Sequence, residues 1–133
     1  MKKLTLILSL IFTVTLSSPS YADWTRVSST KGGATTHYVD LNIIRKDNGY
    51  VYYWHVMNFF KPSPHGLVSM KGYYEGDCRL FRYKTLILSS HQIPMGGGTG
   101  DVEEPVENDW EYPQPKTIAG VILKQVCVQA SPV

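Results

Sequence analysis

The sequence predicts an α+β fold, in which an antiparallel β-sheet of about five to six strands is followed by a C-terminal α-helix packed on it. Runs rich in Val, Tyr and Thr, separated by turn signals, fill the chain up to residue 90, and apolar residues at helical spacing come last. The charged fraction of 18% and the aromatic fraction of 12% are typical of a folded domain, and 133 residues suffice for one domain.

Turn signals mark the limits of the expected strands. Residues 31–33, "KGG", separate the first two strands, and Asn48-Gly49 is a strong hairpin signal. Between these turns, Asp40 is suited to cap a short helical turn over residues 41–46. The expected strands are, in order, residues 23–29, 35–39, 50–61, 67–78 and 80–90, with residues 110–112 as a short edge strand.

The strand predicted for residues 50–61 is apolar on both faces. Strand alternation places Tyr52 and Trp54 on one face and Val51 and Tyr53 on the other. A strand that is apolar on both sides is typical of the centre of a covered sheet. We therefore expect this strand to be central.

Residues 116–130 fit two interpretations. Their Val and Ile content favours a strand, whereas helical spacing gathers Ile118, Ile122 and Val126 on one side, with Thr117 placed to cap the helix. Gly120 is unfavourable within a helix. The pattern favours the helix, with a strand as the alternative.

The first 22 residues have the pattern of a secretory signal peptide. Lys2 and Lys3 precede an apolar run over residues 4–16, and a small-x-small cleavage site ends at Ala22. The run is shorter than the roughly 20 residues that span a bilayer. We expect cleavage between Ala22 and Asp23.

The remaining residues, 23–133, are expected to form a single domain of zero net charge. Cleavage removes two of the 13 basic residues and no acidic one, which leaves 11 of each. Such a domain has no long-range field to attract nucleic acid. Because position 23 is Asp and not the Cys of a lipoprotein, we expect an exported protein, periplasmic or secreted, without a lipid anchor or stable membrane insertion.

The two cysteines, Cys78 and Cys127, are expected to form a disulfide bond. An exported protein folds in an oxidising compartment, and a bridge here would close a loop of about 50 residues, for which chain entropy predicts about 4 kcal/mol of stabilisation. A metal site is the alternative, but two cysteines supply at most half of a zinc site.

The glycine-rich loop over residues 96–100, "GGGTG", lacks the features of a phosphate-binding loop. No glycine stands at the sixth position of a dinucleotide fingerprint, and Gly100 is followed by "DVEEP" rather than Lys-Ser or Lys-Thr. We expect no nucleotide to bind. Glycines at positive φ are expected to turn the chain there.

Nothing else in the sequence predicts catalysis. The four histidines form no metal-binding pair, no GxSxG motif occurs, and the acidic residues between 101 and 111 lack the order of a calcium loop. We therefore expect no catalytic, cofactor-binding or metal-binding residues and no cofactor. A small hydrolase is the least favoured function.

The tyrosines are the remaining functional signal. Tyrosine packs well in sheets, but it is also favoured in protein interfaces because it offers a large area and a hydroxyl group. The candidate protein-binding residues are Tyr52, Tyr53, Tyr73 and Tyr74, with plain packing as the alternative.

The order and spacing of several stretches resemble the surface-adhesin protein E family of Gram-negative bacteria. The resemblance covers residues 24–127 and rests on "THYVDLNIIRKDNGYVYYWHV", "GYYEGDCRLFRYKTL", "PMGGG" and "DWEYPQPKTIAGVILKQVC". It implies an antiparallel sheet with a C-terminal helix that Cys78 and Cys127 tie to the sheet. A named member of the family is an outer-membrane lipoprotein that binds host matrix and serum proteins such as vitronectin and laminin.

These observations together predict an exported, non-enzymatic binding module. The resemblance implies a host matrix or serum protein as the partner. The alternative is a periplasmic envelope protein with an internal protein partner, acting as an inhibitor or an assembly factor.

Overall fold

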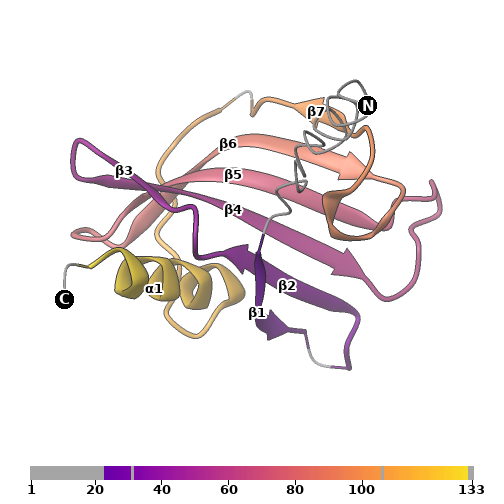
Figure 1. Ribbon diagram of the computed structural model, residues 1–133, viewed down its shortest axis with the longest axis horizontal. Coiled ribbons are helices and arrows are strands. Elements are labelled where there is room, and N and C mark those ends of the chain that lie inside the picture. Colours follow the sequence, from indigo (N-terminus) through magenta and orange to yellow (C-terminus); the bar gives the residue numbers. More distant parts are fainter. Residues whose placement is uncertain (1–22, 31, 106, 132–133) are drawn as a thin grey trace, which may run out of the picture.

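The protein folds as one antiparallel sheet with a helix against one face, which confirms the predicted fold class (Figure 1). The computed structural model describes residues 23–30, 32–105 and 107–131, so residues 1–22 lie outside the described residues and the signal peptide stays a prediction. The sheet order is β1-β2-β4-β5-β6-β7, with β3 paired to β4. The elements are β1 (Trp24–Ser29), β2 (Thr35–Asp40), β3 (Arg45–Asp47), β4 (Tyr50–Phe59), β5 (Ser69–Asp77), β6 (Arg82–His91), η1 (Pro94–Gly96), β7 (Asp101–Glu103) and α1 (Ile118–Ala130).

The helical turn predicted for residues 41–46 is wrong, because the hairpin signal after it takes the chain into the sheet. Asn48 and Gly49 have φ of 51° and 83°, and this tight turn pairs Asp47 with Tyr50 and extends the ladder to Arg45. Asp40 caps no helix. Its carboxylate instead accepts a hydrogen bond from the backbone N–H of Asn42 at 3.1 Å, as in an Asx turn.

The tail is helical, so the strand alternative is wrong. The hydroxyl of Thr117 accepts a hydrogen bond from the backbone N–H of Gly120 at 3.2 Å, which caps the first turn of α1 as predicted. The helix packs Ile122, Leu123 and Val126 onto the sheet. Within the described residues, no helix combines the length and the apolarity needed to cross a membrane.

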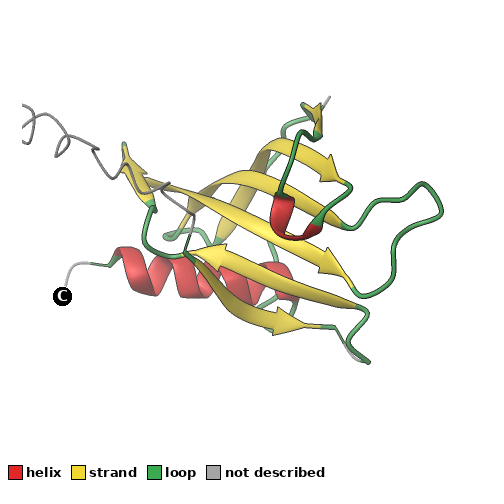
Figure 2. Cartoon of the chain, turned by 45° about the vertical axis from the view of Figure 1, so that its right-hand side comes forward, coloured by secondary structure: helices red, strands yellow, loops and turns green. Residues whose placement is uncertain are grey.

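The central strand β4 has both faces covered in part, as its sequence predicts. Val51 and Tyr53 face α1 and belong to the main core, together with Val39 of β2. On the opposite face, Val56 is 0% exposed. In the view of Figure 2, α1 lies behind the sheet and η1 in front of it, so the two helical segments cover opposite faces.

The glycine-rich loop turns the chain back over one end of the sheet. Gly96 and Gly98 have φ of 63° and 69°, which confirms that glycines at positive φ turn the chain here. The backbone N–H of Gly96 donates to the hydroxyl of Ser69 at 2.9 Å, and that of Met95 donates to the side-chain oxygen of Asn58 at 2.8 Å. The loop therefore covers the sheet face that α1 leaves free, but only at one end.

The edge strand predicted for residues 110–112 is reduced to one residue. Glu111 and Tyr83 exchange two backbone hydrogen bonds of 2.8 and 2.9 Å, as an isolated bridge beside β6. This contact holds the neighbouring Trp110 at the edge of the sheet.

Candidate functional site

The sheet face opposite α1 carries a row of aromatic side chains beyond the end that η1 covers. We name this row the aromatic stripe and define it as Tyr50, Tyr52, Trp54, Tyr73 and Trp110. Alternation along β4 sends three of these side chains to one side, and the register places Tyr73 of β5 directly opposite Trp54. The rings contact one another, with centroid distances of 4.6 Å for Trp54–Tyr73, 6.2 Å for Tyr52–Tyr73 and 5.6 Å for Tyr50–Trp110.

Basic side chains lie over the rings of the stripe. The guanidinium of Arg45 lies 4.3 Å from the ring centre of Tyr52, and the ammonium of Lys71 lies 5.4 Å from that of Trp54. Arg82 and Lys84 approach the ring of Trp110 to 4.1 and 4.6 Å. Such cation–π contacts hold long side chains in place and present ordered donors to solvent.

A buried carboxylate fixes one end of the stripe. Asp77, at the end of β5, is 0% exposed and accepts a hydrogen bond from Nε of Arg82 at 2.9 Å. Burial alone would raise the pKa of Asp77, but hydrogen bonds from Arg82 and from the backbone N–H groups of Leu80 and Arg79 outweigh it and hold the pKa below its usual value. The ion pair thereby orients Arg82 toward Trp110.

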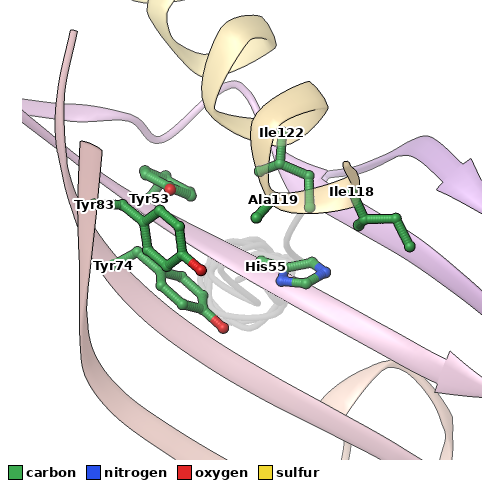
Figure 3. Close-up of a pocket in the computed structure, with 7 residues that line it drawn as sticks. All are labelled: Tyr53, His55, Tyr74, Tyr83, Ile118, Ala119 and Ile122. Carbon is green, nitrogen blue, oxygen red and sulfur yellow. The ribbon is translucent and has the colours of Figure 1, made fainter. Parts of the chain in front are cut away.

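The other face holds a cavity of about 250 Å³ between the sheet and the first turn of α1 (Figure 3). Its walls are Tyr53, His55, Tyr74, Tyr83, Ile118, Ala119 and Ile122. Burial raises the pKa of Tyr74 to about 12, with the charge of Glu111 as a smaller cause. Burial, followed by the charge of His37, lowers the pKa of His55 to about 4.

These geometries divide the four predicted binding tyrosines between two faces. Tyr52 and Tyr73 belong to the aromatic stripe. Tyr53 is 3% exposed and packs under α1, away from the stripe, and its role as a protein-binding residue stays a prediction. Tyr74 lies on the same side and lines the cavity. Trp54 and Trp110, which the sequence did not single out, are the larger members of the stripe.

Comparison with known proteins identifies the family. The sequence profile described as surface-adhesin protein E matches residues 24–128. This chain belongs to the surface-adhesin protein E family. No curated protein sequence matches it.

Two solved structures share the adhesin E fold with this chain. A crystal form II structure of Haemophilus influenzae protein E has a TM-score of 0.63 at 17% identity, covering 83% of this chain and 91% of that one. A structure of protein E from non-typeable Haemophilus influenzae has a TM-score of 0.59 at 15% identity, covering 84% and 79%. At such identities the likeness extends to the fold alone.

The adhesin E fold of this chain also brings into contact two histidines that are distant in the sequence. Nδ1 of His37 and Nε2 of His55 lie 2.9 Å apart on the neighbouring strands β2 and β4, and the rings stack. The remaining ring nitrogen of His37 lies 3.1 Å from the hydroxyl of Thr35. Within the described residues, no group of three or more His, Cys, Asp or Glu residues could hold a metal ion.

We predict that the histidine pair makes the domain sensitive to mild acid. Burial lowers the pKa of His37 and takes that of His55 to about 4, below the unfolded value of 6.5. Between these values the unfolded chain binds protons that the folded chain does not, so stability is complete above pH 6.5 and falls as the pH drops toward 4. We expect a loss of about 2 kcal/mol in the free energy of unfolding between pH 7 and pH 4.5.

Urea denaturation at the two pH values measures this loss. The matched variants are His55→Gln, which should remove most of the pH dependence, and His65→Gln in the exposed loop after β4, which should preserve it. Equal pH dependence in both variants would assign the acid sensitivity to other groups.

Proposed function

We propose that this protein is an exported, non-enzymatic binding module that docks a protein partner on the aromatic stripe. The observation that carries the proposal is the stripe itself, a set of half-buried Tyr and Trp rings held under Arg and Lys side chains on the face that α1 leaves free. Tyrosine, tryptophan and arginine are the residue types that dominate binding energy in protein interfaces. Membership of an adhesin family supports the same role.

The stripe is also preorganised for binding. Each ring contacts a neighbouring ring or a cation, and Arg82 is fixed by the buried Asp77. Rigid aromatic anchors lose little conformational freedom when a partner binds. The strands beneath them are the central strands of the sheet, β4 and β5, which gives the surface a firm support.

For the partner, we propose a host extracellular matrix or serum protein that the module meets after export. The adhesin family supports this class of partner. The competing possibility, an inhibitor or assembly factor confined to the periplasm, differs in location. Protease treatment of intact cells separates the two, because only a surface-exposed or secreted protein is accessible to the enzyme.

The binding test uses the protein lacking residues 1–22 on immobilised matrix and serum proteins. We expect at least one saturable interaction, weakened about tenfold or more by Tyr52→Ser or Arg45→Ser, because interface anchors typically contribute more than 1 kcal/mol. The matched control is Val128→Ser on the outer side of α1, where the side chain is 67% exposed. It should bind like the parent protein.

Two results would overturn the proposal. One is a folded protein that binds no component of the panel and stays inaccessible to protease in intact cells. The other is binding that Val128→Ser weakens and that Tyr52→Ser and Arg45→Ser leave unchanged. Far-UV circular dichroism of each variant confirms that the comparison is made between folded proteins.

A further inference from the structure

We propose that the cavity beneath the first turn of α1 binds a small, uncharged aromatic molecule of one or two fused rings. This site lies on the sheet face opposite the aromatic stripe and is independent of the proposed protein-binding function. It consists of groups from β4, β5 and β6 below and from α1 above (Figure 3).

The size of the cavity sets the size of the ligand. The cavity is partly open to solvent, because most of the residues that line it are only partly buried. An apolar cavity of about 150 Å³ admits benzene, so the roughly 250 Å³ found here has room for a larger planar molecule. A single ring with substituents or a fused pair of rings fits this volume.

Gly72 allows the ring of Tyr74 to lie flat against the sheet, which leaves space above it. A Cβ atom at position 72 would lie 2.5 Å from the hydroxyl oxygen of Tyr74 and 2.6 Å from its ring, so the tyrosine lies over Gly72 as only a glycine permits. Tyr53 stacks on Tyr74 with ring centres 5.5 Å apart, and Tyr83 meets it edge-on at 5.9 Å. These neighbours hold Tyr74 down along the sheet, and the space between it and α1 stays open.

The chemistry of the walls favours an aromatic ligand with a hydrogen-bonding group. The floor consists of tyrosine rings, and the roof consists of the aliphatic side chains of Ile118 and Ile122. Aromatic rings gain from offset stacking and edge-on contact with one another beyond the area that they bury. The hydroxyl of Tyr74 and the imidazole of His55 also line the cavity and supply polar atoms that can orient a ligand.

The walls disfavour charged ligands because the lining is neutral near pH 7. His55 is deprotonated there, since burial lowers its pKa to about 4, and Tyr74 is protonated, since burial raises its pKa to about 12. Glu111 lies beside the hydroxyl of Tyr83, but its side chain is exposed, so solvent screens its charge toward anions and cations alike. An ion would therefore lose hydration without gaining a buried partner.

The proposal is tested with three ligands that share one ring system. Each ligand is titrated into the protein, and binding is monitored by the NMR signals of the isoleucine methyl groups. The probes are indole, the anion indole-3-acetate and the cation tryptamine. We expect indole to bind saturably and to shift the methyl signals of Ile118 and Ile122. The two charged analogues should bind at least about tenfold more weakly.

A cavity-filling variant locates the binding. Ala119→Phe places a ring in the cavity from the first turn of α1 and should weaken indole binding at least about tenfold. Val128→Phe makes the same kind of change on the exposed side of the helix and should leave indole binding unchanged. If Ala119→Phe does not fold, nuclear Overhauser effects between indole and the Ile118 and Ile122 methyl groups of the parent protein decide the location.

The proposal fails on any of three results. These are the absence of indole binding up to the solubility limit of indole, charged analogues that bind as tightly as indole, and Overhauser effects from indole to residues outside the cavity. Saturable binding with the predicted preference and contacts supports it.

Discussion

Loss of the disulfide bond is expected to lower the free energy of unfolding by about 4 kcal/mol. Cys78 follows β5 and Cys127 lies in the last turns of α1, 49 residues along the chain, so the bond closes a long loop and ties the helix to the sheet. In the chain-entropy account, removing it gives the unfolded chain freedom that the bond had denied. The structure confirms the pairing that the sequence predicts.

Urea denaturation of the parent protein and of the double variant Cys78→Ser, Cys127→Ser measures this effect. Val128→Ser, next to Cys127 but exposed, is the control and should change stability little. A double variant as stable as the parent protein would show that helix packing alone holds α1 on the sheet.

The Gly120→Ala substitution is expected to destabilise the protein by about 3 kcal/mol, although alanine is the better helix former. Gly120 lies in the first turn of α1, where a Cβ atom would lie 2.1 Å from the backbone oxygen of Gln114. A backbone carbonyl cannot rotate away as a side chain can, so the segment that leads into the helix would have to shift. Helix propensity alone predicts the opposite sign, a gain of about 1 kcal/mol.

Thermal and urea unfolding of Gly120→Ala, compared with Gly66→Ala, separate crowding from backbone preference. Gly66 has φ of 78° and open space where a Cβ atom would lie, so its substitution should cost about 1 kcal/mol through the backbone alone. Stability that is unchanged or raised in Gly120→Ala would show that the loop before α1 yields easily.

Local rules predicted those parts of the fold that depend on neighbours in the sequence. Asn48-Gly49 forms the tight turn, Thr117 caps the helix, and the apolar spacing of residues 118–126 faces the core. Gly120 has a low helix propensity and therefore counted against the helix in the sequence. Helix propensity describes a residue's preference within an isolated helix and not its contacts with the rest of the chain. The reason for a glycine at this position is the close approach of the backbone oxygen of Gln114, in the segment that leads into α1, which helix propensity does not take into account.

The short helical turn expected after Asp40 failed for a related reason. A capping residue followed by apolar residues is a helix signal only where no stronger pairing competes. Here the tight turn at Asn48 and Gly49 brings Arg45 opposite Tyr52, and the ladder hydrogen bonds outweigh a single turn of helix.

The composition of the candidate sites depends on tertiary features that cannot be read from the sequence. Tyr52 and Tyr53 are neighbours on one strand and must point to opposite faces, but both faces of β4 are apolar, so the sequence does not show which face α1 covers. The register of β2 against β4 brings His37 to His55, and that register is set by tertiary pairing. Trp110 lies outside the strands of the sheet and is brought to the stripe by the bridge at Glu111 and by its contacts with Tyr50 and Arg82.

The most direct test of the central claim, that the aromatic stripe is the docking surface, is NMR cross-saturation with the partner found in the binding panel. The indole N–H groups of Trp54 and Trp110 report on the stripe, and the exposed methyl groups of Val128 report on the outer side of α1. We predict that saturating the partner attenuates both indole signals and leaves the Val128 methyl signals unchanged. Attenuation of Val128 with both indole signals intact would contradict the claim and place the partner on the helix.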